Sequence, residues 1–187
     1  MARTRAVDTI GHEPVMLQEV IAALAPRSGG RYLDGTFGGG GHSAAILLAS
    51  GPDGTVLAID ADPAAAERAA ALRGTLYQPD RLTLVHGNFG DMTRIARDAG
   101  TVPLNGILLD LGLSSFQLDD PNRGFSFRFE SPIDMRFDPT RGEPAGALVN
   151  ALPARDLAAI IWRYGEETRS RRIAAAIERE REQAPIE

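Results

Sequence analysis

The chain contains no cysteine and no lysine, so all 20 of its basic residues are arginine. Without cysteine there can be no disulfide and no thiolate metal site. No metal is expected among the site residues, and the absence of cysteine fits a cytoplasmic protein. Without lysine the sequence cannot contain a Walker phosphate-binding loop. An all-arginine basic set is typical of a GC-rich genome, although arginine also suits phosphate binding and base stacking.

Long apolar runs are absent as well. The first eight residues are too short and too polar for a signal peptide, so we expect a cytoplasmic protein with no membrane partner. A net charge of −5 argues against a protein that coats nucleic acid. It still permits an enzyme that contacts RNA through a local patch. The 187 residues, 43% of them hydrophobic, are enough for a domain with a real core.

Short apolar segments alternate with helical patterns over the first 110 residues. A run such as 55–60, apolar on both faces, is typical of a parallel sheet covered by helices on each side. The alternation predicts an α/β fold with a doubly wound, Rossmann-like parallel sheet. Strands are expected at 31–34, 55–60, 82–86 and 106–110, with helices at 14–24, 42–49, 62–73 and 92–99.

The pattern changes after Asp110. Residues 111–145 combine turn formers, aromatics and charges without a sustained period, and a helical pattern begins at Leu148. It predicts helices over 153–164 and 166–183. Since no fifth strand is expected, the four-stranded sheet would end on a half-exposed edge.

The most informative segment joins the first strand to its helix. Four consecutive glycines, 38–41, allow unusual backbone dihedral angles and close approach to a ligand. The helix that follows directs its unpaired N–H groups toward this loop. Asp60 ends the next strand nineteen residues after Gly41, a spacing at which a carboxylate can reach ribose hydroxyls. A nucleoside-containing cofactor is therefore predicted.

Four strand ends supply polar or aromatic side chains: Asp34, Asp60, Phe89 and Asp110. Any one of these carboxylates could simply cap the next helix. Together they predict one ligand crevice at the carboxyl edge of the sheet.

The loop narrows the choice of cofactor. The dinucleotide pattern G-x-G-x-x-G cannot be completed from either Gly35 or Gly38, which disfavours a nicotinamide cofactor and an NAD-dependent oxidoreductase. A single acidic residue at Asp60 suits an adenosine ribose without a second nucleotide half. S-adenosylmethionine is such a ligand.

Nine ordered motifs resemble the bacterial MraW/RsmH family. That family methylates the exocyclic N4 amine of a cytosine in small-subunit (16S) ribosomal RNA, so the resemblance implies an S-adenosylmethionine-dependent enzyme. Its partner would be this RNA or the assembling small subunit, and homodimer formation is left open. The motifs are His12-Glu-Pro-Val-Met-Leu, 33–42, 58–63, 106–115, 117–120, 123–127, 134–136, 138–142 and Tyr164-Gly-Glu-Glu.

The resemblance implies a cofactor site of seven residues: Gly40, Gly41, His42, Asp60, Phe89, Asp110 and Gln117. The loop residues would hold the amino-acid end of the cofactor. Asp60 would bind the ribose hydroxyls and Phe89 would lie against adenine, while the last two residues would complete the pocket near the methionine side. Read without the family, His42 is a neighbour of the helix N-cap.

Catalysis needs an acceptor for the protons of a weakly nucleophilic amine. Other amino-methyltransferases use an Asn/Asp-Pro-Pro-aromatic segment after the fourth strand, where this chain has Asp110-Leu-Gly-Leu-Ser-Ser. We expect Asp110 and backbone carbonyls near 111–112 to take that part, with Ser114 and Ser115 as weaker candidates.

Candidate RNA-binding residues lie beyond this segment. Arg123, Phe125, Phe127 and Arg136 interleave cations and aromatics, which suits stacking on a splayed-out base. In the alternative interpretation, Phe125, Phe127 and Phe129 form a local core. The arginines at 163, 169, 171 and 172 could face phosphates, but neighbouring glutamates favour a solvated helix face.

The family carries a seven-stranded sheet with a helical domain inserted after the fourth strand. This chain would then comprise a cofactor-binding domain at 1–113 and the start of a mainly helical substrate-recognition domain at 114–187, without the remaining strands. One alternative is a truncated fragment that binds the cofactor and transfers nothing.

Overall fold

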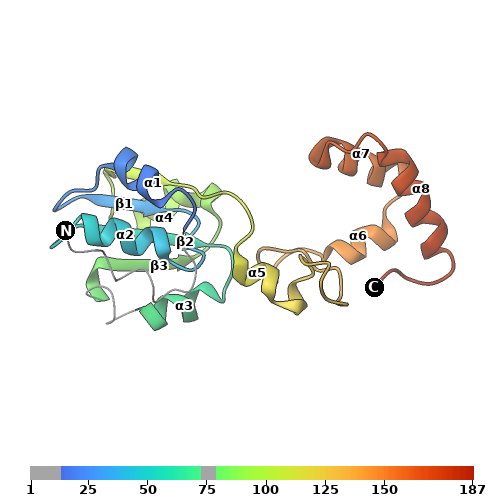
Figure 1. Cartoon of the computed structure of the whole chain (residues 1–187), viewed down its shortest axis with the longest axis horizontal. Coiled ribbons are helices and arrows are strands. Elements are labelled where there is room, and N and C mark those ends of the chain that lie inside the picture. The colour runs from blue at the N-terminus through green and yellow to red at the C-terminus, as the bar shows by residue number, and fades with distance from the viewer. Residues whose placement is uncertain (1–13, 73–78) are drawn as a thin grey trace. The chain divides into compact units, whose positions relative to one another are not determined.

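The computed structural model describes residues 14–72 and 79–187, so His12, Glu13 and Arg73 of the expected motifs and helices lie outside it. The chain divides into two compact units, Met1–Ser114 and Ser115–Glu187. Figure 1 shows the alternating elements of the first unit. In chain order these are α1 (Leu17–Leu24), β1 (Arg31–Asp34), α2 (Gly41–Ala49), β2 (Thr55–Asp60), α3 (Ala65–Leu72), β3 (Leu82–His86), α4 (Met92–Asp98) and β4 (Gly106–Leu108), with 3-10 turns at Pro79–Arg81 and Phe89–Asp91.

All four strands pair in parallel in the order β3-β2-β1-β4. The predicted α/β fold is therefore confirmed, and the first three strands have the predicted bounds. The fourth ends two residues early, at Leu108, so Asp110 lies in the loop that follows the strand. The strand order reverses between β1 and β4, which is where open α/β sheets bind their ligands.

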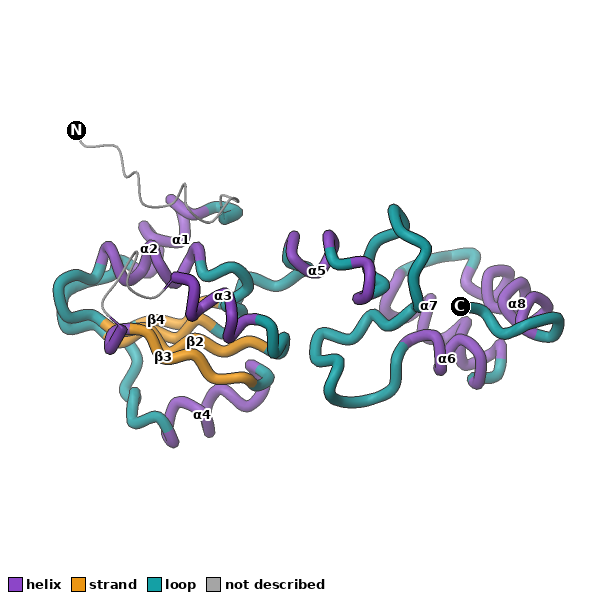
Figure 2. The backbone as a smooth tube through the Cα atoms, turned by 90° about the horizontal axis from the view of Figure 1, so that it is seen from below, coloured by secondary structure: helices purple, strands orange, loops and turns teal. Residues whose placement is uncertain are grey.

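Helices cover both faces of the sheet, as Figure 2 shows, with α4 on one side and α2 and α3 on the other. The alternation along β2 explains this arrangement. Val56 and Ala58 pack with residues of α2 and α3, while Leu57 and Ile59 pack with α4. All four side chains are at most 1% exposed, as expected for a strand buried on both faces.

β4 forms the expected half-exposed edge. It pairs with β1 through Gly106, Ile107 and Leu108. Leu108 packs against the core on the α2 face, whereas Ile107 remains 48% exposed. The covered face and the open face of this strand therefore follow the two-residue period of its side chains.

The second unit is helical: α5 (Ser115–Asp119), a 3-10 turn (Pro121–Arg123), α6 (Ala145–Ala151), α7 (Ala154–Gly165) and α8 (Ser170–Arg181). The predicted helix over 153–164 is confirmed, while the next begins four residues later than predicted because Glu166 adopts a left-handed conformation that ends α7. α7 and α8 pack through Leu157, Ala158 and Ala174. Within 14–72 and 79–187, no helix has the length and apolarity needed to cross a membrane.

Candidate cofactor and catalytic site

Two hydrogen bonds tie together the loops that leave β1 and β4. The backbone N–H of Gly35 donates to the carbonyl of Leu108 at 2.9 Å. The backbone N–H of Asp110 donates to the Thr36 hydroxyl at 2.7 Å. The two loops therefore have fixed positions at the reversal point of the strand order.

The glycine loop (residues 35–41) needs glycine at several positions for different reasons. Gly38 and Gly40 have positive φ angles of 53° and 81°, which favour glycine. At Gly41, the first residue of α2, a Cβ atom would lie 2.4 Å from the Cγ of Pro14. Gly38 and Gly40 are thus needed for their backbone conformation, while Gly41 is needed because a side chain there would collide with Pro14. The first N–H groups of α2 have no acceptor within the helix and are available to a ligand.

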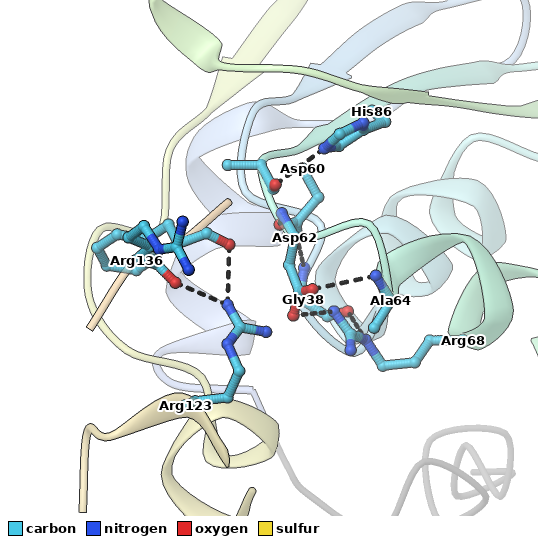
Figure 3. A network of polar contacts seen from close by, with 10 residues as sticks. Gly38, Asp60, Asp62, Ala64, Arg68, His86, Arg123 and Arg136 are labelled. Carbon is cyan, nitrogen blue, oxygen red and sulfur yellow. Dashed lines mark hydrogen bonds and ion pairs between the residues drawn. The ribbon is translucent and has the colours of Figure 1, made fainter. Parts of the chain in front are cut away.

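The carboxylate of Asp60 is part of a polar network at the end of β2, drawn in Figure 3. It accepts the N–H of Gly38 at 2.7 Å through Oδ2 and the N–H of Asp62 at 2.8 Å through Oδ1. Asp62 in turn accepts the N–H of Ala64 and pairs with Arg68, which donates to the carbonyl of Gly38. Each carboxylate oxygen can accept more than one hydrogen bond, so Asp60 can still bind a hydroxyl.

Phe89 lies close to Gly35, the first residue of the glycine loop. A Cβ atom on Gly35 would be 3.1 Å from the Cβ of Phe89 and 2.4 Å from the Cδ2 of Leu109. The Phe89 side chain keeps 37% of its surface exposed, which leaves an apolar surface beside the loop.

His42 and Asp110 face each other across the site. His42 is the second residue of α2 and is buried, whereas the Asp110 side chain is 50% exposed. The Nδ1 atom of the ring lies 3.6 Å from the Asp110 carboxylate, and Nε2 lies 3.1 Å from the carbonyl oxygen of Val15. The predicted loop, Asp60, Phe89 and Asp110 therefore all belong to the carboxyl edge of one sheet.

Asp34 does not line this crevice, so the expectation that its carboxylate joins the others is wrong. Its side chain is fully buried and accepts the Ser43 hydroxyl at 2.7 Å and the Thr36 N–H at 3.1 Å. Burial raises the pKa of Asp34, while the hydrogen bonds from Ser43 and Thr36 oppose that effect. Asp34 instead links Thr36 of the glycine loop to Ser43 of α2 through hydrogen bonds, a role that the sequence did not predict. The two-residue spacing to Thr36, typical of an Asx turn, was the available signal.

The remaining candidates belong to the second unit. Gln117 is a buried residue of α5. Arg123 is buried too, and its Nη2 atom donates to the carbonyls of Arg136 and Phe137, both at 2.9 Å (Figure 3). The Arg136 guanidinium pairs with Asp134. Both arginines thus organise the loop around 134–137, and their contacts with RNA remain predictions.

The aromatic residues after Arg123 do not form a common local core. Phe125 packs against Phe137 with ring centroids 5.5 Å apart, but Phe127 is fully exposed and Phe129 is 40% exposed. The local-core interpretation is therefore wrong for the last two, and Phe127 is free to stack on a base. The four arginines singled out above are exposed as well: Arg163 in α7, Arg169 just before α8, and Arg171 and Arg172 in α8.

The fold and this edge define a class: a Rossmann-like α/β protein with a glycine-rich loop at its topological switch point. Comparison with known proteins identifies the family within that class. The model of the MraW methylase family matches residues 9–187, and the chain belongs to this family. The resemblance inferred from the motifs is confirmed.

Curated relatives agree with the family. The chain is 60% identical over 176 residues to a protein of Thermomicrobium roseum named ribosomal RNA small subunit methyltransferase H, with 94% of this chain and 53% of the relative covered. Proteins of the same name from Acidiphilium cryptum and Gluconobacter oxydans are 52% and 54% identical over 178 and 176 residues, covering 95% and 94% of this chain and 55% and 52% of theirs. The chain thus spans about half the length of the curated relatives it matches.

Proposed function

We propose that this protein acts in S-adenosylmethionine-dependent methylation of the exocyclic N4 amine of a cytosine in 16S ribosomal RNA. Membership of the MraW methylase family and relatives named as small-subunit RNA methyltransferases support this proposal. The nicotinamide oxidoreductase is disfavoured by the same relatives and by the failed dinucleotide pattern.

The residues of the candidate site fit S-adenosylmethionine. Gly38 and Gly40 have left-handed backbones and carry no Cβ atom, so the loop that would hold the amino-acid end can approach a ligand closely at these positions. Asp60 is fixed by two backbone N–H groups and retains acceptor capacity for ribose hydroxyls. Phe89 offers a partly exposed ring for the adenine region.

The catalytic proposal rests on the environment of Asp110. Its backbone N–H is held by Thr36 and its carboxylate faces His42, yet half of the side-chain surface is exposed. The bound cofactor would supply a methyl group already activated by its sulfonium. The protein must then orient the cytosine amine and accept its proton, and we assign the proton to the Asp110 carboxylate.

The alternative is a fragment that binds the cofactor without catalysis. Both interpretations predict cofactor binding, so only methyl transfer separates them. The Asp110 environment is compatible with catalysis, because its backbone N–H is held by Thr36 while half of its side chain is exposed.

The test is methyl transfer to small ribosomal subunits from cells that lack the modification, followed by nucleoside analysis. This chain and a version extended to the length of its relatives are assayed in parallel. N4-methylcytidine is the expected product of the extended protein. A methyl group on another atom would contradict the assignment of the reaction, and transfer by the extended version alone would make this chain the cofactor-binding fragment.

A further inference from the structure

The surroundings of His42 define which of its ring nitrogens carry hydrogen. Its Nε2 atom lies 3.1 Å from the carbonyl oxygen of Val15. A carbonyl oxygen can only accept, so Nε2 must carry a hydrogen to make this contact favourable. The ring is only 7% exposed, and water therefore has little room to replace that partner.

The other nitrogen meets an acceptor as well. Nδ1 lies 3.6 Å from Oδ2 of Asp110. If Nδ1 were unprotonated, its lone pair would face a carboxylate oxygen, and the contact would be repulsive. If the hydrogen were on Nδ1 alone, the Nε2 lone pair would face the Val15 carbonyl. Only the doubly protonated ring makes both contacts favourable.

We propose that His42 is a positioning residue whose imidazolium, anchored to the Val15 carbonyl, holds the Asp110 carboxylate in place for the reaction. This inference rests on the proposed function of Asp110. Two acids act on the ring: Asp110 from the loop after β4, and the buried carboxyl of Asp34 from β1. Asp34 is already engaged by Ser43 and Thr36, so Asp110 is the acid that His42 can orient.

Placement of Asp110 then depends on two contacts. Thr36 holds its backbone N–H, and His42 holds its half-exposed side chain. Without His42 the carboxylate could rotate into solvent while its backbone stayed in place. A misplacement of about 1 Å at a reacting group can cost roughly 100-fold in rate, so the effect on methyl transfer would far exceed the effect on folding.

The first test is the nitrogen-15 NMR spectrum of the His42 ring in the wild-type chain, Asp110→Asn and Asp98→Asn. Asp98 is an acid on α4, across the sheet, and serves as the matched control. Loss of the Asp110 carboxylate should move the Nδ1 resonance of His42, because Nδ1 faces that carboxylate. Asp98→Asn should leave this resonance at its wild-type position. An unchanged Nδ1 resonance in Asp110→Asn would overturn the proposal.

The second test is a double-mutant cycle of methyl transfer with His42→Gln and Asp110→Asn. Measured at saturating cofactor, His42→Gln should lower the rate about 10- to 100-fold, because the carboxylate that His42 positions would be misplaced. Added to Asp110→Asn, it should cost nothing further, because the residue it positions is already gone. Fully additive losses would overturn the proposal. If the wild type transfers no methyl group, the proposed function fails, and the NMR comparison alone decides whether Asp110 contacts the His42 ring.

Discussion

The hydroxyl of Thr36 accepts a 2.7 Å hydrogen bond from the backbone N–H of Asp110, 74 residues further along the chain. Thr36 follows β1, and Asp110 follows β4, so this bond links the two strands between which the sheet reverses its order. The position of the candidate proton acceptor is therefore determined by the glycine loop as well as by its own strand. The candidate cofactor site and the candidate catalytic residue are therefore connected by this hydrogen bond.

Thr36→Val tests this link, because valine has a similar shape but offers no acceptor. The N–H it leaves is near the surface and can bind water, so we expect a stability loss of about 1 kcal/mol or less. Methyl transfer should fall about tenfold because Asp110 loses its anchor. Thr36→Ser keeps the hydroxyl and is the control. Equal rates for the two variants would show that the bond does not position Asp110.

Gly40→Ala tests the backbone of the glycine loop. Alanine at a φ of 81° should cost about 1–2 kcal/mol of stability. Gly100 has a φ of 65° and open space around it, so Gly100→Ala carries the same strain away from the site. Denaturant unfolding should give similar losses for both, whereas calorimetry should give a cofactor affinity reduced about tenfold only for Gly40→Ala. Equal affinities would remove Gly40 from the site.

Asp34→Asn should change how stability depends on pH. Burial raises the pKa of Asp34 above 3.8 in the folded protein. Between that value and the folded pKa the native state binds more protons than the unfolded state, so the free energy of unfolding falls as pH rises through this window. Asparagine can still accept from Thr36 and donate to Ser43 without ionising. The variant should therefore lose less stability than the wild type as pH rises.

Urea unfolding from pH 4 to pH 7.5 measures this difference. The stability of Asp34→Asn relative to the wild type should increase with pH and then level off. Parallel curves would contradict the assignment of a buried acid whose charged form is disfavoured. Asp53→Asn is a useful comparison, because hydrogen bonds from Ser28 and Gly29 lower the pKa of this exposed acid below 3.8. The stability that Asp53 contributes is lost mainly as pH falls below this range, so Asp53→Asn should run nearly parallel to the wild type from pH 5 to pH 7.5.

Asp110→Asn should separate catalysis from binding. Asparagine keeps the size of the side chain and its backbone bond to Thr36, but it cannot accept a proton in the reaction. We expect methyl transfer to fall by about 100-fold or more, with cofactor affinity changed only slightly. Comparable losses in rate and in affinity would reduce Asp110 to a binding residue.

Much of the first unit was predictable because its signals are local. The run 55–60 is apolar on both faces and proved to be a doubly covered strand, and the glycines of 38–41 marked the loop before α2. The reach of Asp60 to the glycine loop also followed from spacing, since parallel strands end at one edge of the sheet.

The rest depended on contacts that spacing cannot reveal. Asp34 and Asp60 each end a strand, yet Asp34 is fully buried and hydrogen-bonded to Ser43, whereas Asp60 is partly exposed. Likewise, the arginine and aromatic residues at 123–129 form one sequence pattern but differ in how deeply they are buried. Arg123 is buried against backbone carbonyls, while Phe127 is exposed. Side-chain partners far apart in the chain decide such cases.

The central claim is that the glycine loop and Asp60 hold S-adenosylmethionine, and calorimetric titration of this chain tests it most directly. S-adenosylmethionine should bind and NAD should not. Asp60→Asn should weaken binding about 10- to 100-fold, because a hydrogen bond to a charged acceptor contributes about 1.5–3 kcal/mol, and Asp98→Asn should leave it unchanged. Preferential binding of NAD, or full affinity in Asp60→Asn, would contradict the account.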